Sequence, residues 1–255
     1  MPVDYGKAIG RAWDYSANTK RVCVFTLFAL VSAAFVLAPL LFVYSKIVAM
    51  GSFSILVMMQ SFVWLFLGIV IASLIFTYAM LMFVNNYATR KSLSVSAGFA
   101  RSNYLRFLGV MIVSVAVTTA VSIVPFGIGI LLSIIAGFVF FFIYQEVGVR
   151  GNGIHDTLSN SYNLFMKNKL DTLITFILST VLSIVIIVIF AVPLLIVGFM
   201  SVFSAIRTGA FMQALMAQAP LLAVTGIIFA IGAVFAILFS NSIRTDVYMQ
   251  LKEVK

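Results

Sequence analysis

The chain alternates long apolar runs with short polar segments. Five stretches contain no charged residue, and they cover residues 22–45, 47–89, 107–145, 172–206 and 208–243. A helix needs about 20 apolar residues to cross the hydrocarbon core of a bilayer, so each stretch is long enough to span a membrane at least once. The pattern therefore predicts an all-α membrane protein.

The third stretch is too long for a single span. As one helix, its 39 residues would extend about 58 Å, nearly twice the hydrocarbon thickness of about 30 Å. Its middle carries Pro125, Gly127 and Gly129, residue types that interrupt helices. Splitting the stretch there gives six predicted spans, at about 22–45, 60–84, 105–124, 126–146, 172–198 and 221–243.

Two apolar segments lie outside these spans. Residues 47–59 either extend a span at a tilt or lie on the membrane surface as a lead-in. Residues 199–220 carry Met, Phe and Leu at helical spacing and end at Pro220. We predict that this second segment forms a separate helix in the outer interface, stopped by the proline.

Basic residues gather on one side of the membrane if the N-terminus is inside. The outer loops then hold only Lys46 and Arg207. The inner segments hold fourteen basic residues: Lys7, Arg11, Lys20, Arg21, Arg90, Lys91, Arg101, Arg106, Arg150, Lys167, Lys169, Arg244, Lys252 and Lys255. Cytoplasmic loops carry such an excess of Lys and Arg. We therefore expect a multi-pass protein of the cell membrane with both termini in the cytoplasm.

Composition supports the same class. Of the 255 residues, 63% are hydrophobic and 9% are charged, whereas soluble domains are about a quarter charged. The net charge of +9 is interpreted as topology-setting charge that attracts anionic lipid, and no nucleic-acid partner is expected. Cys23 is the only cysteine, so an intrachain disulfide is excluded.

Residues 8–39, 92–125 and 153–193 can be laid over one another. Each has an asparagine where an amphipathic part meets a span, a basic residue within three positions, and a proline 21, 22 or 25 residues beyond the asparagine. The asparagines are Asn18, Asn103 and Asn168. The pattern indicates an interfacial amphipathic helix that turns into the bilayer at a polar hinge. The alternative is that inner loops are in general basic and somewhat amphipathic.

On the repeat interpretation, residues 1–255 form a single polytopic membrane domain built from three direct repeats. Each repeat is an interfacial amphipathic helix followed by a helical hairpin, and the units cover about residues 1–86, 87–150 and 151–255. All three have the same orientation, so they are expected to be related by an axis along the membrane normal.

One inner segment, FVFFFIYQEVGVRGNGIHDTLSNSYNLFMKNKLDTL, carries a recognisable pattern. An aromatic-rich span ends near a Glu and is followed by a Gly-containing turn, a helix with Ser beside an aromatic residue, and a basic-Asn step. The positions are Glu146, Gly151, Gly153, Ser161, Tyr162, Lys167 and Asn168. The pattern resembles a signature of uncharacterised prokaryotic six-span families and of the membrane domain of some glycerophosphodiester phosphodiesterases.

The earlier segment FVNNYATRKSLSVSAGFARSNYLRFLGV resembles the matching loop, so the similarity covers roughly residues 60–190. Members of these families often have Pro two residues before the Glu, where this chain has Tyr144. The resemblance implies a six-span fold. The sequence shows no soluble phosphodiesterase domain, so no catalytic residue is carried over.

The predicted spans offer little chemistry. No ionisable residue lies near the middle of any of them, although such groups mark functional sites in membranes. Glu146 and Asp171 are placed at inner ends, where we expect snorkelling or water to reach them, and His155 is expected on the surface beside Asp156. Small residues on the last span suit close helix contact, either within the bundle or with a partner: Gly226, Ala230, Gly232 and Ala233. We predict no catalytic, cofactor or metal site.

Three functions remain in competition. The favoured one is a non-enzymatic scaffold or accessory subunit that interacts with lipids or partner proteins at the cytoplasmic face. The alternative is a transporter or channel for an uncharged or amphipathic solute. An intramembrane lipid enzyme is disfavoured because catalytic groups are lacking. Partners are expected to be membrane lipids, other membrane subunits or a second copy of the chain.

The inner surface gives the most specific expectation. Arg101, Arg106, Lys167 and Lys169 flank the entrances of spans, and we expect them to contact anionic lipid headgroups. All seven acidic residues also fall inside, which leaves a net inner charge of +7. Two local pairs are expected, Asp4 with Lys7 and Asp14 with Arg11. Alternatively, the basic residues only fix topology during insertion.

Overall fold

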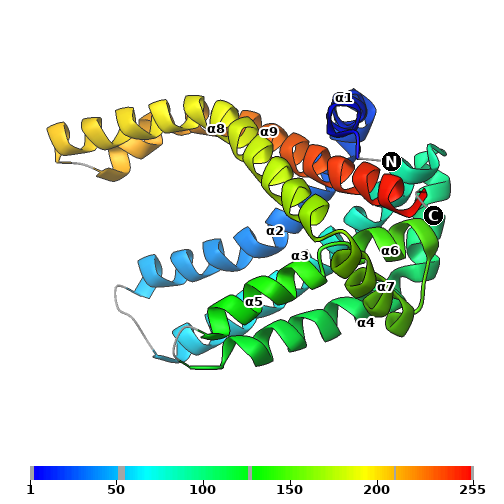
Figure 1. The fold of residues 1–255 in the computed structure, drawn as a ribbon. Helices are drawn as coiled ribbons and strands as arrows, with labels where there is room; N and C mark the ends of the chain where they lie inside the picture. Colours follow the sequence, from blue (N-terminus) through cyan, green and yellow to red (C-terminus); the bar gives the residue numbers. More distant parts are fainter. Residues whose placement is uncertain (1–2, 51–54, 126–127, 210, 254–255) are drawn as a thin grey trace.

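The computed structural model describes residues 3–50, 55–125, 128–209 and 211–253, and every regular element in these ranges is an α-helix (Figure 1). The helices are α1 (Tyr5–Ser16), α2 (Thr19–Met50), α3 (Ile55–Thr89), α4 (Leu93–Ser122), α5 (Ile128–Val139), α6 (Ile143–Arg150), α7 (Ile154–Lys167), α8 (Lys169–Thr208) and α9 (Phe211–Glu253).

Six helical segments of the described chain are long and apolar enough to cross a membrane. They are Thr19–Phe42, Phe62–Thr89, Leu93–Ser122, Ile128–Arg150, Lys169–Ser204 and Ala217–Lys252. The predicted all-α class and the six predicted spans are confirmed. By the length and composition of its helices, the chain is a multi-pass membrane protein.

The split of the long third stretch lies where the sequence placed it. α4 and α5 are separated by a turn that contains Pro125, and the Gly129 N–H donates to the Val124 carbonyl at 3.2 Å. A Cβ at Gly129 would lie 2.7 Å from the Ser122 carbonyl oxygen. The tight turn therefore depends on a residue without a side chain at this position.

The fourth span is broken, which the sequence did not indicate. Helical structure stops at Phe140 and resumes as α6. The Ser161 hydroxyl, which projects from α7 and is fully buried, donates to the Val139 carbonyl at 2.6 Å. It thereby satisfies a backbone group at the end of α5, which matters because unpaired groups are costly in an apolar setting.

The helices break at two of the three predicted hinge positions. α1 and α2 meet at Asn18, whose side-chain oxygen accepts from the Arg21 N–H at 3.3 Å. α7 and α8 meet at Asn168, whose side-chain amide donates to the Leu164 carbonyl at 3.0 Å. In both places the side chain adds a second hydrogen bond at the helix end, because the Arg21 N–H also donates to the Asn18 carbonyl and the Leu164 carbonyl also accepts from the Asn168 N–H.

The third predicted hinge, at Asn103, is wrong, because α4 runs through it without a break. The Asn103 amide donates to the Phe99 carbonyl at 3.0 Å, and its oxygen accepts from Arg106 at 3.3 Å. Both polar groups are thus used along one intact helix, so no helix end is formed for them to cap.

The predicted separate helix at 199–220 is also wrong. Residues 199–208 continue α8, residues 211–220 begin α9, and Pro220 lies inside α9. The chain reverses at Gly209, whose φ of 67° favours glycine. Likewise, residues 47–50 extend α2 and residues 55–59 begin α3, while 51–54 lie outside the described residues.

The helices converge at one end and diverge at the other (Figure 1). α1, α6, α7 and the C-terminal part of α9 gather at the convergent end, together with the start of α8 and the end of α3. We call this the polar end. From there the α8–α9 pair runs apart from α2–α5, and these helices expose large apolar side chains such as Phe62 and Phe203.

Candidate functional site

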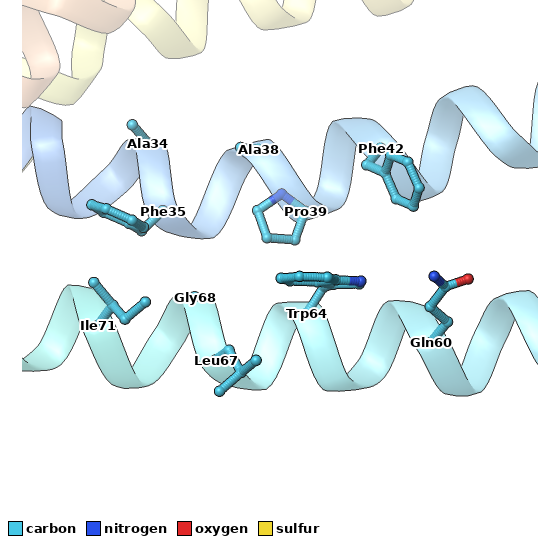
Figure 2. Close-up of a pocket in the computed structure, with 10 residues that line it drawn as sticks. All are labelled: Ala34, Phe35, Ala38, Pro39, Phe42, Gln60, Trp64, Leu67, Gly68 and Ile71. Atoms are coloured by element: carbon cyan, nitrogen blue, oxygen red, sulfur yellow. The ribbon is translucent and has the colours of Figure 1, made fainter.

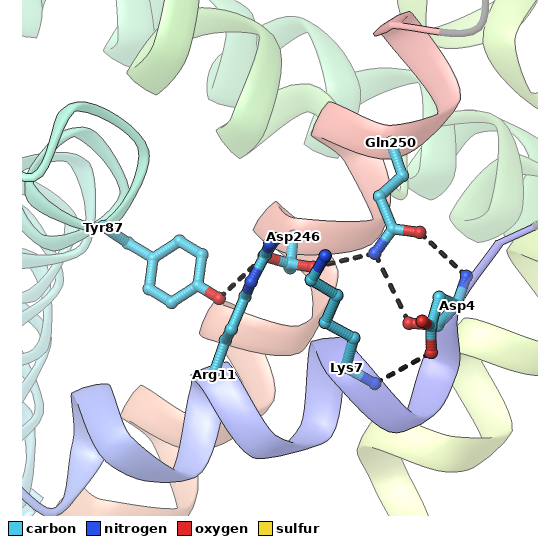
Figure 3. Close-up of polar contacts among 6 residues, drawn as sticks. All are labelled: Asp4, Lys7, Arg11, Tyr87, Asp246 and Gln250. Atoms are coloured by element: carbon cyan, nitrogen blue, oxygen red, sulfur yellow. Dashed lines mark hydrogen bonds and ion pairs between the residues drawn. The ribbon is translucent and has the colours of Figure 1, made fainter.

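Asp246 of α9 is the centre of a polar cluster at the polar end (Figure 3). Its buried carboxylate accepts three hydrogen bonds: from Arg11 Nη1 at 3.3 Å, from the Tyr87 hydroxyl at 3.0 Å and from Gln250 Nε2 at 2.8 Å. Its donors come from α1, α3 and α9 itself. The cluster therefore ties three helices that are far apart in sequence.

Gln250 links this cluster to the start of α1. Its Oε1 accepts from the Asp4 N–H at 2.8 Å, and the Asp4 side chain caps α1 by accepting from the Lys7 N–H at 2.9 Å (Figure 3). The expected pairing of Arg11 with Asp14 is wrong, because Arg11 reaches across to Asp246. The expected Asp4–Lys7 pairing is a backbone cap, not an ion pair.

Glu146 of α6 forms a second buried contact at the polar end. Its side chain is 0% exposed, with Lys252 Nζ 2.7 Å from Oε1 and Asn152 Nδ2 3.0 Å from Oε2. The Lys252 contact is an ion pair by distance but does not have hydrogen-bond geometry. The expectation that water reaches Glu146 is wrong, because α9 places a lysine against it instead.

Asp171 is also engaged by another helix. The Tyr5 hydroxyl of α1 donates to its Oδ1 at 2.8 Å, at the start of α8. Burial and the hydrogen bond to this carboxylate raise the pKa of the Tyr5 hydroxyl above its ordinary value. Four carboxylates at the polar end therefore contact other groups of the protein: Asp4, Glu146, Asp171 and Asp246.

The four basic residues expected to contact lipid are all exposed. Arg101 and Arg106 project from α4, while Lys167 and Lys169 lie on either side of the α7–α8 junction. None of the four forms an ion pair with a described residue. Because Glu146 and Asp246 are buried and paired with other cations, they do not neutralise these four charges at the surface.

These four residues do not form one pocket. Arg106 Nη1 donates to the Gly151 carbonyl at 3.2 Å, just before α7 begins. Lys167 ends the same helix, whose 14 residues extend about 20 Å. Arg106 and Lys167 therefore lie toward opposite ends of α7. We call the four exposed residues together the basic surface.

An apolar cavity of about 670 Å³ lies between α2 and α3 (Figure 2). In Figure 2 the Trp64 ring faces Pro39, and Gln60 is the polar residue at one end. The lining is otherwise apolar: Ala34, Phe35, Ala38, Phe42, Leu67, Gly68 and Ile71. The abundance of Phe in the sequence gave no indication of which segments would line a cavity.

Beside this cavity the backbones of α2 and α3 touch. A Cβ at Gly68 would collide with the Phe35 carbonyl oxygen and lie 3.3 Å from Pro39 Cγ. Since proline has no N–H, Pro39 leaves the Phe35 carbonyl without its usual helical donor. The close approach of Gly68 places its Cα against this free oxygen, a contact that favours a weak Cα–H···O interaction.

Groups suited to metal binding are not gathered in the described residues. No cluster of three or more His, Cys, Asp or Glu side chains occurs there. His155 Nδ1 lies 3.6 Å from Asp156 Oδ1, and both side chains are largely exposed to solvent. As expected from the sequence, this pair lies on the surface at the start of α7.

No protein family, no curated protein and no solved structure matches the chain.

Proposed function

We propose that the protein is a non-enzymatic membrane protein, a scaffold or accessory subunit, that holds anionic lipid headgroups or partner proteins at its cytoplasmic face. One observation carries the proposal: Asp246 and Glu146 are buried and paired, while Arg101, Arg106, Lys167 and Lys169 are exposed and without acidic partners. Such a surface attracts an anionic leaflet.

The same proposal includes the direction in which the chain crosses the membrane. The polar end faces the cytoplasm of the cell membrane, because fourteen of the sixteen Lys and Arg residues lie in the inner segments. The hinged pairs α1–α2 and α7–α8 are equivalent units of a direct repeat, and α4 is the unhinged third unit.

The orientation gives the first prediction. In a Cys23→Ser background, a cysteine at position 150 should react with a membrane-impermeant maleimide only after the inner side is opened. A cysteine at position 207 should react from outside in intact cells. Both native side chains are exposed, so burial does not limit labelling. Labelling of position 150 from the outside of intact cells would contradict the proposed topology.

The second prediction tests the basic surface itself. Each basic side chain near an anionic leaflet contributes on the order of 1 kcal/mol. Changing Arg101, Arg106, Lys167 and Lys169 together to glutamine should therefore lower the preference for phosphatidylglycerol over phosphatidylcholine at least tenfold. Native mass spectrometry of the purified protein with mixed lipids measures this preference.

A matched control is the double change Lys46→Gln and Arg207→Gln, which removes positive charge on the opposite side. This variant should keep the full preference for the anionic lipid. Two results would contradict the proposal: equal retention of both lipids by the unaltered protein, or an unchanged lipid preference in the fourfold variant. Either result would mean that these four residues only set the topology.

A second candidate function is favoured by the cavity between α2 and α3. Its apolar walls and the single amide of Gln60 suit an uncharged or amphipathic solute, as a transporter or channel would require. Uptake of such a solute by vesicles that contain only this protein, lost when Gly68→Leu fills the space between the helices, would favour this function over the scaffold.

A further inference from the structure

Arg244 is a cation inside a candidate membrane span. It lies in α9, eight residues before the end of the segment Ala217–Lys252, or about 12 Å along the helix. Its side chain is partly buried. Arg11 and Lys252 nearby in the fold each pair with a carboxylate, but no described acidic residue pairs with Arg244.

Two contacts hold the guanidinium in place. Its Nε donates to the buried Ser179 hydroxyl of α8 at 3.2 Å. Its Cζ lies 4.8 Å from the centre of the Phe141 ring, in the break between α5 and α6. The side chain is thus fixed at the point where α8, α9 and the α5–α6 break meet, with its planar group stacked on an aromatic ring.

The remaining donors of this group have no hydrogen-bond acceptor among the residues that the structure describes. A guanidinium carries five N–H donors, and only the one on Nε is used. Neither Nη atom hydrogen-bonds to a described residue, and neither is sealed from the surface. Cations in a membrane segment occur where something compensates their charge, so the unused donors of Arg244 are available to an acceptor from outside the chain.

The surroundings restrict what that acceptor can be. Phe176 of α8 contacts Phe141 with ring centres 6.1 Å apart, and Phe176 and Ile177 are exposed beside it on the membrane-facing surface. The outer surface beside Arg244, where α8, α9 and the α5–α6 break meet, is therefore apolar. We call this meeting point the seam. Along α9, Ser240, Ser242 and Thr245 beside Arg244 are buried and Asn241 is half-buried, so these side chains offer no polar outer surface there. A cation next to exposed apolar side chains matches a phosphate that is attached to apolar chains, which is what a phospholipid presents.

We infer that Arg244 binds the phosphate of one phospholipid, held at the seam between α8, α9 and the α5–α6 break. A guanidinium matches phosphate oxygens through two parallel hydrogen bonds. The inference deepens the proposed function, on which it rests in taking lipid as the ligand. The Arg244 site and the basic surface differ in what they recognise: the basic surface selects lipids with a net negative charge, whereas the Arg244 site selects a phosphate group.

The test is lipid retention by the purified full chain in native mass spectrometry. The probes are phosphatidylglycerol, phosphatidylcholine and diacylglycerol. The unaltered protein should retain one copy of either phospholipid at least tenfold more strongly than diacylglycerol. This comparison needs no variant, so it stands even if substitutions at Arg244 fold poorly.

Variants then assign the site. Arg244→Gln, whose amide still reaches toward Ser179, should lose the retained phospholipid. Arg244→Lys should keep it partly, since a lysine supplies charge without the paired donors. The variant with Arg101, Arg106, Lys167 and Lys169 changed to glutamine should retain this one phospholipid, even if its preference for phosphatidylglycerol disappears.

The outcomes separate the two proposals. Full retention by Arg244→Gln, or equal retention of diacylglycerol by the unaltered protein, overturns the Arg244 site and leaves the basic surface untouched. Loss of the single phospholipid from the fourfold variant overturns it as well. Inorganic phosphate that displaces the lipid and stays bound would identify soluble phosphate as the ligand and overturn the lipid assignment.

Discussion

Lys252→Met is expected to lower the free energy of unfolding by about 3–5 kcal/mol, the usual cost of leaving a buried charge without its partner. Lys252 lies 2.7 Å from Glu146, a side chain that is 0% exposed. Methionine keeps the length and apolar stem of lysine. The loss therefore reports on the charge of Glu146 and not on a cavity.

A double-mutant cycle separates charge from packing. Adding Glu146→Gln to Lys252→Met removes the unpaired charge, so the double variant should recover most of the lost stability. Lys167→Met is the matched control, because Lys167 is exposed and unpaired; it should change stability by less than about 0.5 kcal/mol. Unfolding by SDS in mixed micelles measures the unaltered protein, the two single variants of the pair, the double variant and the control. The buried pair would be contradicted if the Lys252→Met variant were as stable as the unaltered protein, or if the double variant were no more stable than Lys252→Met alone.

Gly68→Ala is expected to cost about 1–3 kcal/mol through overpacking of α2 against α3. The added Cβ would collide with the Phe35 carbonyl oxygen and lie 3.1 Å from the Phe35 carbonyl carbon. Both are backbone atoms, so a rotamer change cannot relieve the contact. The two helices must separate, which also disturbs the cavity that they enclose.

Gly226→Ala provides the control for this change. Gly226 lies in α9 within a candidate span, and a Cβ there would meet nothing within 4 Å. Alanine is the better helix former by about 1 kcal/mol, so this variant should be neutral or more stable. Thermal unfolding in one detergent compares the two. Equal behaviour of Gly68→Ala and Gly226→Ala would show that α2 and α3 are not in backbone contact.

The spans were predictable because they depend on local composition. Absence of charge located them, and the Pro125 turn divided the longest stretch, since both effects act over a few residues. The hinges at Asn18 and Asn168 were predictable for the same reason. Gly232 also matches its expectation, because a Cβ there would strike the Phe190 side chain, whereas Gly226 makes no close contact.

The polar end was not predictable, because its contacts join distant residues. Arg11 and Asp246 are 235 positions apart, and the nearer Asp14 was the natural choice from sequence alone. The break before α6 depends on Ser161, which lies 22 positions after the carbonyl that it satisfies. Arg244 was noticed only as one inner charge among fourteen, since its lack of a partner is a property of the fold.

A density map of the protein in nanodiscs that contain both phosphatidylglycerol and phosphatidylcholine tests the central claim most directly. The account predicts ordered headgroup density against Arg101, Arg106, Lys167 and Lys169, on the same side of the bilayer as α1 and α7. A map with well-defined side chains at these four positions but no headgroup density beside them, or with ordered headgroups only at the α8–α9 turn, would contradict it.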